Sequence, residues 1–174
     1  MAESVLVTEA HTIGGIAVIR SLGRAGYRVV AISAKADALG FYSRFAAKTI
    51  HCPAYSADFT PWLRQTIARE QISQIIGSES FLHAIRTDFA EFATLLPISS
   101  DPAIVYRAFH KCDVHARMCV VGHTDHLPDS CELRSGQADE DYPIRKPDLV
   151  DDRVLAQAWV PGVGAGVGVL AKDG

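Results

Sequence analysis

The sequence lacks a long apolar run, an N-terminal targeting pattern and a block of basic residues. No stretch reaches the length needed to span a bilayer, and the N-terminus, MAESVLVTEA, has no basic segment ahead of an apolar one. We therefore expect a cytoplasmic protein with no membrane partner. The formal net charge is -3, and the 17 Lys and Arg residues are scattered along the chain, so no surface for nucleic acid is expected.

Cysteine is also scarce, with four residues at positions 52, 112, 119 and 131. In a chain without an export signal they are expected to be thiols rather than a disulfide framework. Stability must then come from a hydrophobic core. The 174 residues, 48% hydrophobic and 21% charged, have the ordinary composition of a globular protein and suffice for one domain, or for one domain and part of another.

What the first hundred residues contain is an alternation of apolar runs and helical patterns. Strands are predicted at residues 5–7, 28–33, 47–52, 74–77 and 96–99, and helices at 13–25, 58–70 and 80–93. The run RVVAIS at 28–33 is typical of a strand covered on both faces. Gly26 stands where the first helix would be capped, and Asp58 or Thr60 could cap the second. The pattern predicts an α/β fold, a Rossmann-like open parallel sheet over residues 1–99.

The composition changes near residue 100, which we take as a domain boundary, with a second domain over 100–174. A helix is predicted at 101–121 with a break near 109–113, followed by a polar, turn-rich stretch over 122–141. Strands are predicted at 142–146, 154–160 and 166–170. The glycine-rich run at 162–168 lies between two strands instead of before a helix, so it indicates a hairpin or bulge and not a phosphate cradle.

The loop after the first strand, EAHTIGG, does not have the G-x-G-x-x-G spacing of a dinucleotide site. The second strand ends at Ser33 without an acidic residue that could bind a ribose. Gly14 and Gly15 are therefore expected to permit a tight turn. An NAD(P)-linked enzyme remains a third, disfavoured hypothesis.

A zinc site could be drawn from Cys112, His115 and Cys119, which would share one face of a helix. The simpler interpretation is that the cysteines are small core residues, because no second ligand pair has a zinc spacing. No Ser-His-Asp or Cys-His arrangement can be assembled, so no catalytic residue and no metal ligand is predicted.

The order of segments along the chain resembles that of ATP-grasp proteins, in particular those akin to the carbamoyl-phosphate synthase large subunit and biotin carboxylase. The resemblance rests on AVIRSLGRAGYRVVAIS (17–33), SRFAAKTIHCP (43–53), LLPISSDPAIVYRAFHKCDVHARM (95–118), YPIRKP (142–147) and VLAQAWVPG (154–162). It implies a Rossmann-like domain over 1–99, followed by a partial α+β ATP-grasp domain over 100–174.

The resemblance also implies a nucleotide site and a chemistry. Lys111 and Lys146 would contact the ATP phosphates, and a hinge strand would bind the adenine edge through Gln157, Ala158, Trp159 and Val160. Such ligases use ATP with Mg²⁺ to convert a small-molecule carboxylate into an acylphosphate that an amine or similar nucleophile attacks. A homodimer is possible.

Three departures from the family pattern point to a fragment that is not competent alone. His110 stands where the family has Asp, only residues 147–156 separate Lys146 from Gln157 where a glycine-rich loop is expected, and the chain ends at Gly174 before the family's metal-binding acidic residues. The alternative hypothesis is a non-catalytic Rossmann-like module that binds a small ligand or contacts a subunit.

Overall fold

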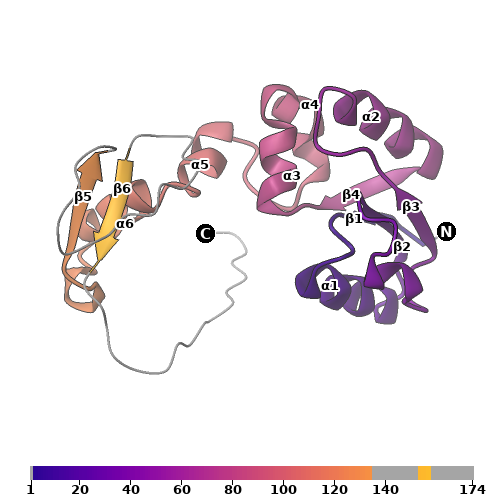
Figure 1. Cartoon of the computed structure of the whole chain (residues 1–174), viewed down its shortest axis with the longest axis horizontal. Helices are drawn as coiled ribbons and strands as arrows, with labels where there is room; N and C mark the ends of the chain where they lie inside the picture. Colours follow the sequence, from indigo (N-terminus) through magenta and orange to yellow (C-terminus); the bar gives the residue numbers. More distant parts are fainter. Residues whose placement is uncertain (1, 135–152, 158–174) are drawn as a thin grey trace. The chain divides into compact units, whose positions relative to one another are not determined.

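The structure of the chain is a computed structural model, which describes residues 2–134 and 153–157 (Figure 1). The chain forms two compact units, Met1–Tyr106 and Arg107–Gly174. Each unit is described by itself below.

The first unit is built on a four-stranded parallel sheet in the order β3-β2-β1-β4. Its strands are β1 (Ser4–Val7), β2 (Arg28–Ser33), β3 (Lys48–His51) and β4 (Ile72–Ile76). Val7 at the end of β1 lies opposite both Ala31 of β2 and Ile76 of β4. The chain thus moves outwards from β1 to β3 and then crosses back to place β4 on the other side of β1.

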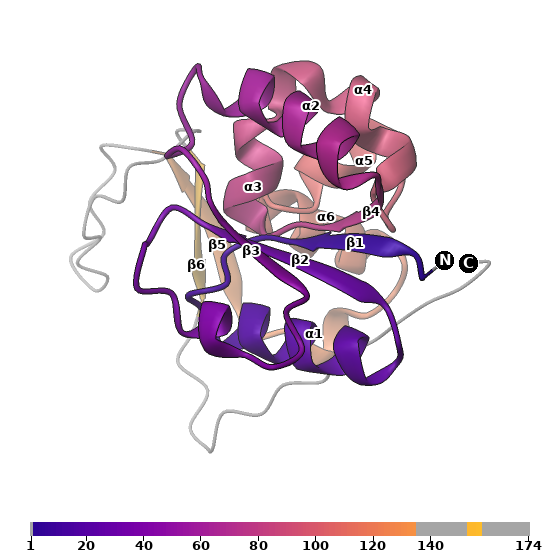
Figure 2. The same cartoon turned by 90° about the vertical axis from the view of Figure 1, so that its right-hand side faces the viewer.

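Helices cover both faces of this sheet (Figure 2). The helix α1 (Ile13–Arg24) lies on one face, and α2 (Phe59–Glu70), α3 (Glu79–Ala84) and α4 (Phe89–Phe92) lie on the other. Short 3-10 turns complete the unit: η1 (Leu39–Tyr42), η2 (Arg86–Asp88) and η3 (Ala93–Leu95). The predicted α/β class with a Rossmann-like parallel sheet is confirmed by this arrangement.

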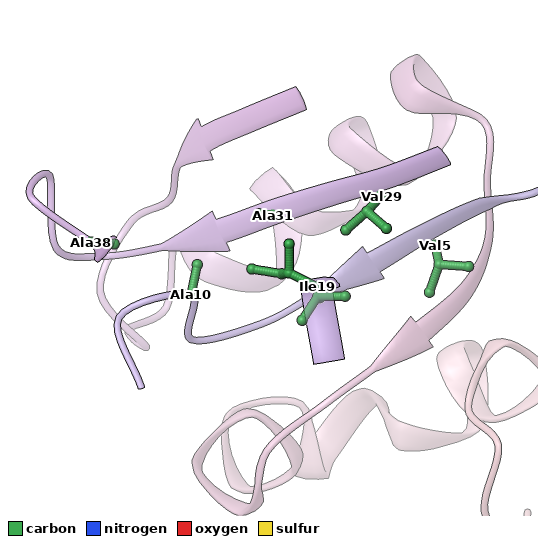
Figure 3. Close-up of a cluster of buried hydrophobic side chains, with 7 residues drawn as sticks. Val5, Ala10, Ile19, Val29, Ala31 and Ala38 are labelled. Atoms are coloured by element: carbon green, nitrogen blue, oxygen red, sulfur yellow. The ribbon is translucent and has the colours of Figure 1, made fainter. Parts of the chain in front are cut away.

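The core lies in two layers, one on each face of the sheet. On the α1 face, side chains of β1 and β2 pack with Ile19 of α1, as drawn in Figure 3: Val5, Val7, Val29 and Ala31. Because successive strand residues point to opposite faces, Leu6, Val30 and Ile32 serve the other layer, and all three are fully buried. The prediction that 28–33 is covered on both faces is therefore correct.

Local sequence explains where α1 begins and ends. Thr12 is its N-cap, and the Thr12 hydroxyl accepts a hydrogen bond from the Gly15 N–H at 3.0 Å. At the other end Gly26 has a φ of 90°, and the Tyr27 N–H donates to the Leu22 carbonyl at 3.1 Å. This is the left-handed cap that Gly26 predicts.

Two predicted elements of the first unit are wrong. The helix expected at 80–93 is broken into α3, η2, α4 and η3, beginning earlier, after its N-cap Ser78. No strand forms at 96–99 within the described chain, whose parallel sheet has four strands. Pro97 within that run cannot donate a ladder hydrogen bond, and Ile98 remains 43% exposed, so little favours pairing there.

The helix α5 (Pro102–Arg107) closes the first unit, and the second contains α6 (Lys111–Val120), η4 (Thr124–His126) and an antiparallel pair, β5 (Ser130–Arg134) and β6 (Arg153–Gln157). The gap between α5 and α6 confirms a helix break before Lys111. Sequence reasoning missed β5, because its segment is polar and rich in turn residues. The strands predicted at 142–146 and 166–170, and the glycine run at 162–168, lie outside the described residues.

None of the described helices is long and apolar enough to cross a membrane.

Candidate functional site

The carboxyl edge of the parallel sheet is the place where this fold can hold a ligand. β1 and β4 are neighbours, but the chain leaves β1 for α1 on one face and leaves β4 for α3 on the opposite face. In open α/β sheets, ligands bind outside the carboxyl ends of the strands at such a reversal of strand order. The loops after β1 and β4 are therefore the candidate site.

The loop after β1 is a tight turn with a strained residue. Glu9 has a φ of 50°, a left-handed conformation that side chains rarely adopt. The Glu9 carbonyl accepts hydrogen bonds from the Thr12 N–H at 2.9 Å and from the Thr12 hydroxyl at 3.0 Å. The cap residue of α1 thus also closes the turn.

The two glycines of this loop differ in whether the structure leaves room for a side chain. A Cβ on Gly15 would lie 2.4 Å from the Glu9 carbonyl oxygen, so only glycine lets the turn approach the helix this closely. A Cβ on Gly14 would meet nothing within 4 Å. The expectation that the pair permits a tight turn therefore holds for Gly15, while packing does not require glycine at position 14.

A backbone and a side-chain hydrogen bond connect the ends of β1 and β4. The Thr8 N–H donates to the Ile76 carbonyl at 3.1 Å, and the Ser78 N–H donates to the Thr8 hydroxyl at 3.1 Å. Thr8 is only 4% exposed, and Ser78 also caps α3 through the Phe81 N–H at 3.1 Å. The edge between the two strands is therefore lined by positioned hydroxyl groups.

Tyr55, in the segment after β3, reaches the same two hydroxyl groups. Burial of its phenol raises the pKa of Tyr55, the negative charge of Glu9 adds to this, and hydrogen bonds with Ser78 and Thr8 oppose it. Tyr55 therefore remains a neutral phenol at physiological pH. Its place in the structure brings the segments after β1, β3 and β4 together.

Cys52, which follows β3, is also near Glu9. Burial raises the pKa of the Cys52 thiol to about 11, the hydrogen bond to its own backbone lowers it in part, and the charge of Glu9 raises it further. A thiol with this pKa is protonated at neutral pH and is a poor nucleophile. Cys52 is therefore no candidate nucleophile.

On the β2 side of the edge, the His11 ring lies against Ser33. Their Nδ1 and Oγ atoms are 3.1 Å apart, and the Ser33 Oγ also accepts the Lys35 N–H at 3.0 Å. The direction of the first bond depends on the His11 tautomer. Ser33, 2% exposed, thereby anchors His11 beside the turn that holds Glu9.

The residues that the ATP-grasp resemblance selects are only partly described. Lys111 is the exposed first residue of α6, and Gln157 at the end of β6 is exposed and donates to the Ser130 hydroxyl at 3.3 Å. Lys146, Ala158, Trp159 and Val160 lie outside the described residues. Whether these six positions converge on one ligand stays a prediction.

Metal binding, which the ATP-grasp resemblance implies, has no support among the residues that the structure describes. Over 2–134 and 153–157, no group of three or more His, Cys, Asp or Glu side chains could hold a metal ion. Of the positions considered for zinc, His115 and Cys119 do approach each other, with 3.9 Å between Nδ1 and Sγ on successive turns of α6. Two ligands of this kind do not make a structural zinc site.

Comparison with known proteins finds similar solved structures but no family. No protein-family model and no curated protein matches the chain. Among solved structures it is similar to 4-hydroxyisoleucine dehydrogenase complexed with NADH and to a mutant of that enzyme complexed with NADH and succinate, at 14% and 15% identity and a TM-score of 0.37 for both. Each match covers 68% of this chain and 50% of the dehydrogenase chain, so only half of those proteins' length is represented.

The ATP-grasp resemblance is wrong. No family model supports it, and the two solved structures named above are complexes of a dehydrogenase with NADH and not of an ATP-grasp ligase. The ligase activity, the acylphosphate chemistry and the ATP and Mg²⁺ cofactors were implied by that resemblance alone and are withdrawn with it. The physical reason is that its first segment, 17–33, is an amphipathic helix, a glycine cap and a buried strand. Any doubly wound sheet requires that sequence of elements, so the segment indicates the fold but gives no information about the function.

Sequence reasoning missed the residues that line the edge, because Thr8, Glu9, Tyr55 and Ser78 form no motif. One signal was present. Polar residues follow β1 directly and follow β4 after Gly77, at the carboxyl ends where this fold places its ligands.

Proposed function

We propose that the first unit is a small-ligand-binding module whose ligand is held at the carboxyl edge of the sheet by the loops after β1 and β4. The observation that carries this proposal is the strand order β3-β2-β1-β4, with Thr8 and Ser78 hydrogen-bonded across the point of reversal. Tyr55 supplies a third hydroxyl group there. We propose binding without catalysis by this unit, since Cys52 and Tyr55 are both held in their neutral forms. The cytoplasmic location goes with this proposal.

A dinucleotide such as NADH is the second candidate, because it is the ligand of the solved structures named above. The first loop argues against it. Gly15 is required by the Glu9 carbonyl, and the charge of Glu9 reaches the edge where a pyrophosphate would have to lie. We therefore propose a ligand other than a dinucleotide.

A fragment screen on the ¹⁵N-labelled full chain tests the proposal. Binding fragments should shift the amides of residues 8–15 and 77–80 above all others. Gly14→Leu should abolish these shifts without loss of stability, because its side chain enters the open space beside the turn. Ala17→Leu, at an exposed position further along α1, is the matched control and should bind normally. Shifts confined to other residues, or equal in both variants, would overturn the proposal, and NADH binding at micromolar strength would replace it with the dinucleotide reading.

A further inference from the structure

Glu9 is placed at a cost that the fold does not explain. The turn needs a left-handed residue at this position, and glycine would adopt a φ of 50° without strain. The turn itself is held by the Glu9 carbonyl, which any residue would supply. The carboxylate side chain therefore has no role in closing the turn.

The Glu9 carboxylate also lacks a partner within the described chain. The residue is half-buried, yet across residues 2–134 and 153–157 no hydrogen bond or ion pair reaches its side-chain oxygens. The charge of Glu9 also contributes to raising the pKa of Cys52 and Tyr55, which places the carboxylate close to both side chains. The candidate edge therefore carries a carboxylate that no described side chain pairs with.

Glu70, in the same unit, is a buried carboxylate with ion-pair partners. Its oxygens lie 2.8 Å from the Lys48 ammonium and 2.9 and 3.1 Å from the guanidinium nitrogens of Arg28 and Arg69. Buried carboxylates are normally paired in this way. Glu9 differs in that it is only half-buried, so water reaches its carboxylate and a ligand can replace that water. It has no ion-pair partner among the described residues, and it lies at the edge where the fold can hold a ligand.

Exposed apolar side chains flank the same turn. The Gly40 N–H donates to the Ala10 carbonyl at 2.8 Å and so ties η1 to the loop after β1. On η1, Leu39 is 69% and Tyr42 is 78% exposed, and Ile13 at the start of α1 is 89% exposed. Apolar surface is thus available beside the carboxylate.

We propose that Glu9 binds the ammonium group of a small ligand whose apolar body lies against the surface around η1 and the start of α1. This inference rests on the proposed function and names the ligand class of that site. An ammonium group supplies the charge-assisted hydrogen bonds that the carboxylate lacks, while the hydroxyl groups of Thr8, Ser78 and Tyr55 offer neutral contacts nearby. An anionic ligand would be repelled by the charge of Glu9.

Three probes of equal size and different charge test the ligand class on the full chain: benzylamine, benzyl alcohol and benzoate, titrated while amide shifts are followed. The dissociation constant obtained from the amide shifts of residues 8–15 should be at least about tenfold lower for benzylamine than for the other two probes, as expected for one charge-assisted hydrogen bond. Glu9→Gln should abolish this preference, with Glu3→Gln, an exposed carboxylate that precedes β1, as the matched control that retains it.

The outcomes distinguish an error in the ligand class from an error in the proposed binding site. If benzyl alcohol or benzoate shifts these amides as tightly as benzylamine, in both the parent and Glu9→Gln, the ammonium class is wrong while the site stands. If neither these probes nor a broad fragment library shifts them, the proposed function fails as well.

Thermal unfolding of Glu9→Gly provides a measurement that needs no ligand. A residue kept for binding and not for the fold should give a higher melting temperature when replaced by glycine, because the strained φ is relieved. A lower melting temperature would show that the Glu9 side chain supports the fold, and would overturn the inference.

Discussion

Gly15 is the residue on which the first loop most depends. Its missing Cβ lets the Glu9 carbonyl lie where the Thr12 N–H and hydroxyl can both reach it. Gly14, its neighbour in the sequence, lies in open space with no such constraint. Adjacent glycines can therefore look alike in a sequence and differ completely in what they do.

Alanine substitutions should separate the two glycines. Gly15→Ala should lower the free energy of unfolding by about 1–3 kcal/mol, since the Glu9 carbonyl is backbone and cannot move aside without opening the turn. Gly14→Ala should leave stability unchanged or raise it by up to roughly 1 kcal/mol, because alanine favours the helix. Urea unfolding measures both. Equal effects at the two positions would contradict the close approach of the turn to α1.

At the scale of elements, Glu70 holds together the amino ends of several strands. The Glu70 carboxylate at the end of α2 binds Arg28 at the start of β2 and Lys48 at the start of β3. Arg28 in turn donates to the Ser4 hydroxyl of β1 at 3.3 Å and to the Glu70 carbonyl at 3.1 Å. The hydrogen bonds from Lys48 above all, then those from Arg28, lower the pKa of Glu70 from 4.5 to about 2, although burial opposes them.

The lowered pKa of Glu70 makes its contribution pH-dependent. The carboxylate gains its partners only in the folded state, so its contribution is complete above pH 4.5 and is lost as the pH falls towards 2. Glu70→Gln should lower the free energy of unfolding by on the order of 1–3 kcal/mol at pH 7. The difference from the parent should shrink between pH 4.5 and 2.

Urea unfolding at a series of pH values measures this difference. Glu3→Gln, at an exposed position, is the control and should behave like the parent throughout. A difference for Glu70→Gln that stays constant down to pH 2 would show that the ion pairs are not its source.

At the scale of the whole molecule, the first unit contains nearly all of the described core. Every described buried hydrophobic residue except Cys112 lies in Met1–Tyr106. Tyr106 closes this core: its hydroxyl donates to the Leu82 carbonyl at 2.7 Å, and its ring meets Phe89 edge-on with 5.6 Å between centroids. Tyr106 and Val105, both on α5, thus belong with the sheet domain.

Two truncations test whether the first unit folds alone and where it ends. Residues 1–108 should unfold cooperatively, because they keep the whole core and its closing helix. Residues 1–99, which end at the boundary predicted from composition, should be less stable by about 3–5 kcal/mol, since losing Tyr106 uncovers Leu82 and Phe89. Circular dichroism during urea unfolding measures both fragments. Equal stability of the two would place the end of the domain at residue 99.

Much of the fold could be predicted from local patterns. The RVVAIS strand, the cap at Gly26 and the alternation of strands and helices all follow from propensity and hydrophobic pattern, which act over a few residues. The predictions failed where a strand depends on its pairing partner. The run at 96–99 has a strand-like composition but no partner strand, and β5 is polar but pairs with a strand distant in the sequence. The sequence of one segment alone does not determine whether that segment pairs with another strand.

The candidate site was determined by tertiary structure. The sequence by itself determined that a parallel α/β sheet forms and that its first loop lacks a dinucleotide motif, because both depend on residues close together in the chain. Only the folded structure brings Glu9, Tyr55 and Ser78 to one edge, since β4 returns beside β1 after the chain has passed through β2 and β3. It also decided that the Glu9 carboxylate meets no described partner while Glu70 meets three cations, a difference set by three-dimensional surroundings and not by residue type.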